Sequence, residues 1–161
     1  MKKIMLIGLL SLLTSNVYAA TFPMFNEQAL AGVKTFDAKF RIIIWLPEDD
    51  YSEETLPNEE RFQTTANDAF ILGLRRDGVT INEASLDTLY CDVMASINFN
   101  VVTWSVNLDY YKWSLQEEGV HTRLWETRLL ASAGINKFTP EALAKQCQDL
   151  FAKYWLKWNP K

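Results

Sequence analysis

The sequence is poor in the residues on which most active sites depend. Its 161 residues include one histidine and two cysteines, too few for the clustered ligands of a zinc site. The acidic stretch over Pro47–Glu60 lacks the spacing of a calcium loop. No glycine-rich phosphate loop, HExxH or GxSxG motif is present. A catalytic serine or cysteine that needs a histidine as its base would have to use His121, which is expected at the exposed start of a strand. The sequence therefore predicts no metal, no cofactor and no catalytic residue.

An excess of positive charge is also missing. Acidic residues outnumber Lys and Arg by 20 to 16, which gives a formal net charge of −4. Non-specific nucleic-acid binding relies on clustered Lys and Arg that neutralise phosphates. We therefore expect no nucleic-acid partner.

The first residues have the pattern of a secretory signal. Two lysines precede an apolar run over Ile4–Leu13, and Val17–Ala19 forms a small-residue cleavage pattern. The run is too short for a comfortable membrane span. We expect cleavage after Ala19, with no lipid anchor because no cysteine follows that point. Residues 1–19 are thus interpreted as a signal peptide and residues 20–161 as one periplasmic or secreted domain.

The most regular pattern in the chain lies between Leu89 and Trp113. Apolar side chains alternate with polar ones, pause at 98–100, and then alternate again. Because successive side chains of a strand point to opposite faces of a sheet, this pattern predicts two strands with one buried face. The short polar connection indicates an antiparallel hairpin. The expected inward residues are Leu89, Cys91, Val93, Ala95, Ile97 and Phe99, then Val102, Trp104, Val106, Leu108 and Tyr110.

Two helices and three further strands complete the expected fold. Asn58 can cap the first helix and Gly78 can end it, while Thr139 and Pro140 form a helix start. In the strand over Val120–Ala131, the pattern of apolar and polar residues does not decide which side chains point to the core. We predict an α+β two-layer sandwich, with a mostly antiparallel sheet of four to five strands, two helices on one face, and the order β-α-β-β-β-β-α. The remaining elements are strands at Val33–Leu46 and Val79–Asn82, which should be parallel, and helices at 58–77 and 139–158.

The two cysteines are expected to form a disulfide bond. Cys91 lies on the apolar face of its strand, and Cys147 lies on the apolar stripe of the last helix. Disulfides persist in an oxidising compartment outside the cytoplasm. A bridge of this span would stabilise the fold by about 4 kcal/mol in the chain-entropy model. The alternative is two buried free thiols.

Aromatic residues on the polar face of the hairpin suggest a binding surface. Tyr90, Tyr111 and Trp113 fall opposite the core pattern, and aromatic residues are enriched in protein interfaces and in sugar-binding platforms. Alternatively, a loop or the N-terminal segment covers them. A second candidate is the end of the last helix, where Trp155 and Trp158 lie among lysines. That end could touch a membrane surface, although a helix packed on the sheet is favoured.

Carboxylates offer an enzymatic alternative. Glu117 and Glu118 lie at a turn, and Asp109 and Glu126 lie on separate strands that could approach each other. A glycosidase needs two carboxylates at a defined separation in a cleft, which a sequence cannot show. A small envelope hydrolase therefore stays open as a second hypothesis.

The second half of the chain resembles a group of bacterial envelope proteins of undefined function. The residues concerned are the ending Phe151–Pro160, the Trp125-Glu126 pair and the segment Leu74–Val79. The order of elements is also similar to small α/β modules of periplasmic assembly and transport accessory proteins. The resemblance implies a non-catalytic binding or assembly role through contact with an envelope protein. An inhibitor or immunity-type protein, whose partner is an enzyme, is the third hypothesis.

Overall fold

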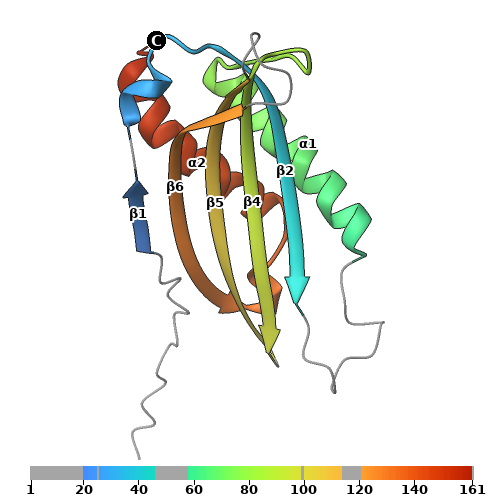
Figure 1. The fold of residues 1–161 in the computed structure, drawn as a ribbon. Helices are drawn as coiled ribbons and strands as arrows, with labels where there is room; N and C mark the ends of the chain where they lie inside the picture. The colour runs from blue at the N-terminus through green and yellow to red at the C-terminus, as the bar shows by residue number, and fades with distance from the viewer. Residues whose placement is uncertain (1–19, 25, 46–57, 99, 114–120, 161) are drawn as a thin grey trace, which may run out of the picture.

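The computed structural model describes residues 20–24, 26–45, 58–98, 100–113 and 121–160 (Figure 1). The expected signal peptide, most of the acidic stretch, Leu46, Phe99, Glu117 and Glu118 lie outside these residues. In chain order the elements are β1 (Ala20–Met24), η1 (Glu27–Leu30), β2 (Thr35–Trp45), α1 (Glu59–Asp77), β3 (Thr80–Ile81), β4 (Asp87–Asn98), β5 (Val101–Trp113), β6 (His121–Gly134), η3 (Ile135–Lys137) and α2 (Pro140–Trp158).

The strands form one sheet in the order β1-β6-β5-β4-β2-β3. The hairpin of β4 and β5 is antiparallel as expected, and so are the pairings of β5 with β6 and of β6 with β1. However, β2 runs parallel to both β4 and β3. The α+β class is confirmed, but the sheet is mixed and the expectation of a mostly antiparallel one is wrong. The parallel β2–β4 pairing arises because the chain crosses through α1 before it returns to the sheet.

Capping residues predicted both ends of α1 and the start of α2, and the structure agrees. The Asn58 side chain accepts a hydrogen bond from the backbone N–H of Arg61, and Gly78 adopts φ 97° after α1. Only a residue without a Cβ adopts this left-handed conformation at little cost. At α2, the Thr139 hydroxyl accepts a hydrogen bond from the N–H of Ala142, and Pro140 occupies the first turn.

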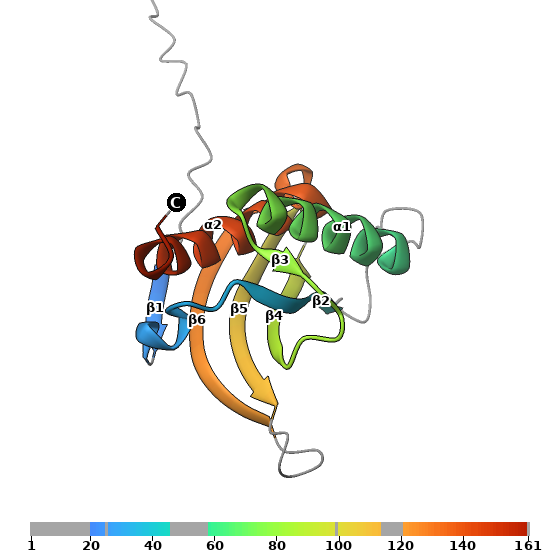
Figure 2. The same ribbon diagram turned by 90° about the horizontal axis from the view of Figure 1, so that it is seen from above.

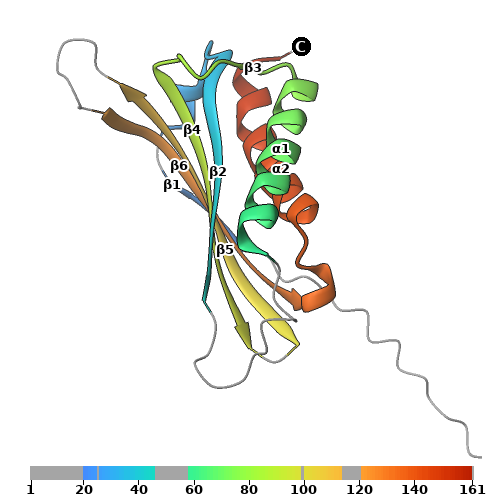
Figure 3. The same cartoon turned by 90° about the vertical axis from the view of Figure 1, so that its right-hand side faces the viewer.

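The two helices lie side by side against the sheet (Figures 2 and 3). Phe40 of β2 packs against Phe70 of α1, while Phe36 of the same strand packs edge-on against Phe151 of α2. Phe36 and Phe40 are an even number of residues apart, so both helices contact the same face of β2. We call this the inner face of the sheet.

The disulfide bond between Cys91 of β4 and Cys147 of α2 is present. The two Cα atoms are 6.2 Å apart, and both residues are fully buried. Every predicted inward residue of β4 and β5 that the structure describes is buried as well. The bond therefore joins the middle of the sheet to the helical layer, as the sequence predicted.

The N-terminal strand β1 was not predicted. It pairs with β6 at one edge of the sheet, although Pro23 and the lack of alternation gave no sign of a strand. Next to β1, η1 contacts the end of α2. The side-chain amide of Asn159 donates a hydrogen bond to the backbone carbonyl of Leu30 at 2.8 Å. The first described residues thus close the edge of the fold beside the last helix.

An irregularity in β6 explains its ambiguous sequence pattern. The register places Trp125 opposite Tyr110 and Arg123 opposite Tyr111, so Leu124 is an extra residue. Such a β-bulge reverses the alternation of the strand on either side of it.

Among the described helices, none is long and apolar enough to cross a membrane.

Candidate functional site

The candidate site is the face of the sheet opposite the helices, which we call the outer face. In Figure 3, α1 and α2 lie on one side of the sheet, and no other described element lies over the opposite side. The alternation of β2, β4, β5 and β6 sends every second side chain to this face. It therefore presents a broad surface built from four strands.

Four aromatic rings gather at one end of the outer face. Tyr90 and Tyr111 meet edge-on with ring centroids 5.8 Å apart, and Tyr111 lies 5.1 Å from His121. The ring of Trp113 lies 4.8 Å from that of His121. We call these residues (Tyr90, Tyr111, Trp113 and His121) the aromatic cluster. It joins β4, β5 and β6 through contacts between neighbouring strands.

The rings of the aromatic cluster are partly accessible. Tyr90 and Tyr111 are half-buried, His121 is exposed, and Trp113 is 36% exposed. The indole N–H of Trp113 donates to the hydroxyl of Thr88 at 3.1 Å, which fixes the ring against the sheet. Burial, reinforced by the negative charge of Asp109, raises the pKa of the Tyr111 phenol, so its hydroxyl stays protonated at neutral pH. The cluster therefore offers fixed apolar ring surfaces together with hydroxyl groups that can donate hydrogen bonds.

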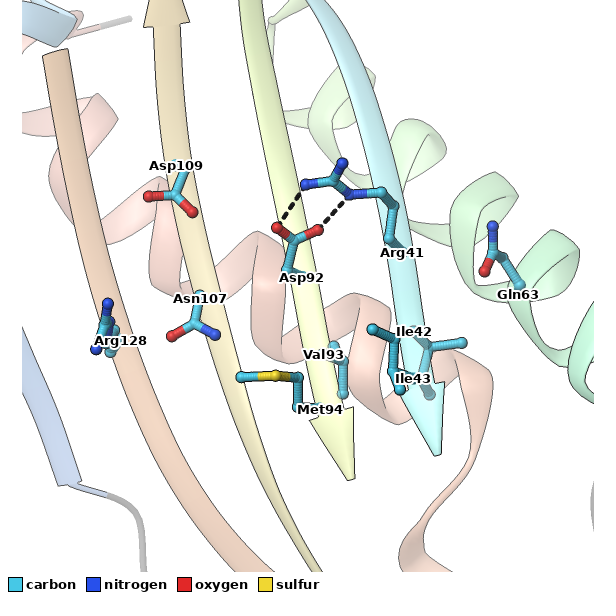
Figure 4. A pocket seen from close by; sticks show the side chains of 10 residues that line it. All are labelled: Arg41, Ile42, Ile43, Gln63, Asp92, Val93, Met94, Asn107, Asp109 and Arg128. Carbon is cyan, nitrogen blue, oxygen red and sulfur yellow. Dashed lines mark hydrogen bonds and ion pairs between the residues drawn. The ribbon is translucent and has the colours of Figure 1, made fainter. Parts of the chain in front are cut away.

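A bidentate ion pair borders the aromatic cluster. Arg41 of β2 donates from Nε and Nη2 to the two carboxylate oxygens of Asp92, at 2.5 and 2.6 Å (Figure 4). Its guanidinium carbon also lies 4.1 Å from the centroid of the Tyr90 ring, a cation–π geometry. The hydrogen bonding that Arg41 donates to Asp92 raises the pKa of Arg41, although burial opposes this. Arg41 thus links β2 to the aromatic cluster.

Two carboxylates meet on the next pair of strands. Asp109 and Glu126 are cross-strand partners, and Arg123 forms ion pairs with both of them. Glu126 is only 5% exposed even though it belongs to the outer face. Burial raises the pKa of the Asp109 carboxyl; the charge of Arg123 acts in the opposite direction, while Glu126 adds to the increase. The sequence prediction that these two acids could approach each other therefore agrees with the register of the strands.

A cavity of about 490 Å³ lies beside these groups. Figure 4 shows charged and amide side chains from β2, β4, β5 and β6 around it. Ile43 and Met94 supply an apolar wall, and they are paired in the β2–β4 register. The polar lining residues are Arg41, Gln63, Asp92, Asn107, Asp109 and Arg128. The described residues contain no group of three or more His, Cys, Asp or Glu side chains placed to hold a metal ion.

Only part of the predicted binding surface lies together. Tyr90, Tyr111 and Trp113 form one cluster, whereas Trp155 belongs to the core. Trp155 is 3% exposed and its indole N–H donates to the carbonyl of Val33 at 2.8 Å, so its expected place on the surface was wrong. Trp158 is half-buried, with Lys157 5.3 Å from its ring centroid.

Sequence reasoning missed the contribution of β2 to this surface. Arg41 follows the alternation of its strand, so its outward direction could have been read from the sequence. Its position beside Tyr90 depends on the register in which Lys39 pairs with Tyr90 and Arg41 with Asp92. That register is a long-range pairing with no local signal.

No protein-family model matches the chain, and no curated protein matches it. Among solved structures, it is similar to a PelC dodecamer from Paraburkholderia phytofirmans, with a TM-score of 0.39 and 10% identity over 88% of this chain and 97% of that one. It is also similar to an uncharacterised protein, with a TM-score of 0.35 and 11% identity over 76% of this chain and 87% of that one.

Proposed function

We propose that this protein is a non-catalytic binding or assembly-accessory protein that contacts another protein through the outer face of its sheet. The observation that carries this proposal is the aromatic cluster. Four rings from three strands lie partly accessible on a face that no described element covers. Tyrosine and tryptophan held in place by a rigid sheet supply contact area at low cost in conformational entropy.

The groups around the cluster suit recognition of a polar protein surface. Arg41, Asp92 and Asp109 lie next to the rings, so apolar contact and charged hydrogen bonds are available together. Interfaces commonly combine an aromatic centre with a polar rim. The expected signal peptide and the buried disulfide favour action in the periplasm or outside the cell.

Site-specific photo-crosslinking tests this proposal. A photoreactive phenylalanine analogue would replace Trp113 on the outer face or, as a matched control, the exposed Leu72 of α1. Irradiation in living cells should give one dominant protein adduct from position 113 and none from position 72. The same adducts from both positions, or no adduct from position 113, would contradict the proposal.

The juxtaposition of Asp109 and Glu126 favours a hydrolase as the second candidate. A carboxyl with a raised pKa beside a second carboxyl is a feature of acid–base catalysis. A bell-shaped dependence of glycan hydrolysis on pH, abolished in Asp109→Asn, would support this candidate. An inhibitor or immunity-type role would instead give a photo-crosslinked partner that is an enzyme.

A further inference from the structure

A second surface lies along the edge of β2 opposite β4. Among the residues that the structure describes, β3 alone pairs with it, so we call it the free edge. β3 pairs with this edge at only two positions, Thr35 and Phe36. On its other side, β2 pairs with β4 throughout Asp37–Trp45. The edge therefore extends well beyond the short strand that occupies its beginning.

The direction of the backbone groups along this edge follows from β3. The carbonyls of Lys34 and Phe36 accept hydrogen bonds from Thr80 and Asn82 at 2.8 and 2.9 Å. In a parallel sheet, successive residues of a strand direct their backbone N–H and C=O groups alternately toward the strand on one side and the strand on the other. Ala38, Phe40 and Ile42 must therefore direct their N–H and C=O groups toward the free edge.

The environment of Phe40 agrees with this direction. Its N–H donates to the side-chain oxygen of Asn67 on α1, at 3.0 Å. Within the described parts of the chain, no hydrogen bond occupies the corresponding backbone groups of Ala38 and Ile42. These two residues are otherwise almost fully buried. Buried backbone polar groups are costly unless they find partners.

One row of α1 runs beside the edge. Gln63, Asn67, Ile71 and Arg75 recur every four residues and so lie along one side of the helix. Gln63 lines the cavity of about 490 Å³ together with Ile42. Asn67, Ile71 and Arg75 line a second cavity of about 430 Å³, to which Ala38 contributes. One hollow thus lies between the α1 row and β2 at Ala38, and the cavity of the outer face reaches the edge of β2 at Ile42.

We infer that the groove between this α1 row and the edge of β2 binds an extended peptide segment of a partner protein, which joins the sheet as a further strand. Backbone groups point to this edge at every second residue, about 6.6 Å apart, and another extended backbone matches that repeat. Because Asn67 holds the N–H of Phe40, the donors open to the segment are those of Ala38 and Ile42, about 13 Å apart. The bound segment would lie on the same side of β2 as β3, beyond the residues Thr35 and Phe36 with which β3 pairs.

The cavities indicate which side chains the segment carries. At the Ala38 end, Asp37, Lys39, Arg75 and Glu83 favour polar or charged side chains. At the Ile42 end, Ile43 and Met94 offer apolar contact, while Arg41 and Asp92 offer charged partners. No ring of the aromatic cluster lines either cavity, although Arg41 and Asp92 of the proposed recognition surface line the one at Ile42. The inference rests on the backbone groups of β2 and not on the proposed function.

The inference is tested with peptides selected for binding. Random dodecapeptides displayed on phage would be selected against the disulfide-bonded protein. Peptides that emerge would be synthesised and their affinities measured by calorimetry. We expect binding to slow hydrogen exchange at the amides of Ala38 and Ile42. Methylation of alternate peptide amides, which removes the donors to β2, should abolish binding.

Two matched variants locate the peptide. Ile71→Arg fills the groove and should weaken binding by at least about tenfold. Leu72→Arg places the same side chain on the exposed side of α1 and should leave affinity unchanged. Tyr111→Ala on the outer face should also leave peptide affinity unchanged.

Several results would overturn the inference. These are failure of the selection to yield any binding peptide, equal effects of Ile71→Arg and Leu72→Arg, or unchanged exchange at Ala38 and Ile42 in the bound state. Sedimentation would detect self-association. A dimer that Ile71→Arg converts to a monomer would identify a second copy of this chain as the occupant and contradict the partner peptide.

Discussion

The two faces of the sheet differ although the same strands build both. On the inner face, Phe36, Tyr110 and Trp125 are buried and contact rings of the helical layer or of another strand. On the outer face, Tyr90, Tyr111 and Trp113 contact one another, yet remain partly accessible. Aromatic rings therefore serve stability on one face and are available for recognition on the other. Substitutions should separate these roles.

The largest loss of stability is expected on the inner face. Phe151 is fully buried and contacts the rings of Phe36, Trp125 and Trp155. Phe151→Ala removes these contacts and leaves a cavity, so it should lower the free energy of unfolding by about 3–5 kcal/mol in urea titrations. Tyr111→Ala is the matched control on the outer face. An equal loss in both variants would mean that the two faces do not differ in this way.

Removal of the disulfide bond should have the next largest effect. The double substitution of Cys91 and Cys147 by alanine releases a link across 56 residues between β4 and α2. We expect the free energy of unfolding to fall by about 2–4 kcal/mol, measured by urea titration without reductant. Because the bond lies inside the core, binding at the outer face should survive wherever the variant is folded. Loss of binding by the folded variant would show that the bond also shapes the binding surface.

Arg41 should affect binding more than stability. Its ion pair with Asp92 lies at the surface, where such pairs contribute on the order of 0.5–1 kcal/mol. Arg41→Ala should therefore change the free energy of unfolding by no more than about 1 kcal/mol, while it weakens the partner contact. Lys145→Ala, which breaks an exposed ion pair on α2, is the control and should leave binding intact. Equal binding by both variants would exclude Arg41 from the interface.

The smallest effect is expected at Asp109 and depends on pH. Folding raises the pKa of this carboxyl. At pH values between its pKa in the unfolded chain and its higher pKa in the folded protein, the folded protein therefore binds more protons than the unfolded chain. Stability from this group is therefore greatest at low pH and falls as pH rises through the folded pKa. Asp109→Asn should be slightly more stable than the parent at pH 7, and the difference should vanish on acidification. Asp149→Asn, at an exposed position, is the control. A difference that grows on acidification would contradict this assignment.

The sequence predicted features that depend on local pattern and chemistry. Alternation in β4 and the apolar stripe of α2 placed Cys91 and Cys147 on facing surfaces, and the capping residues Asn58 and Thr139 located both helices. The strand β1 has no alternation, and its pairing with β6 is decided by distant residues. The parallel β2–β4 register, which brings Arg41 to Tyr90, depends on distant pairing in the same way.

Trp155 shows why the candidate site was predicted only in part. Near the end of α2 nearly every side of the helix is apolar or aromatic, so periodicity does not distinguish a buried ring from an exposed one. The decisive contact is a hydrogen bond to the carbonyl of Val33, a residue 122 positions earlier in the chain. By contrast, the outward direction of Tyr90, Tyr111 and Trp113 follows directly from the alternation of their strands.

The most direct test of the central claim compares two double variants in binding and stability. Tyr111→Ala with Trp113→Ala removes aromatic rings from the outer face, and Leu72→Ala with Leu86→Ala removes exposed apolar side chains elsewhere. Affinity for the crosslinked partner and the free energy of unfolding would be measured for each. The account predicts that only the aromatic variant loses binding, while it stays folded and keeps most of its stability. A folded aromatic variant that binds as tightly as the parent would contradict the claim that this face is the recognition surface.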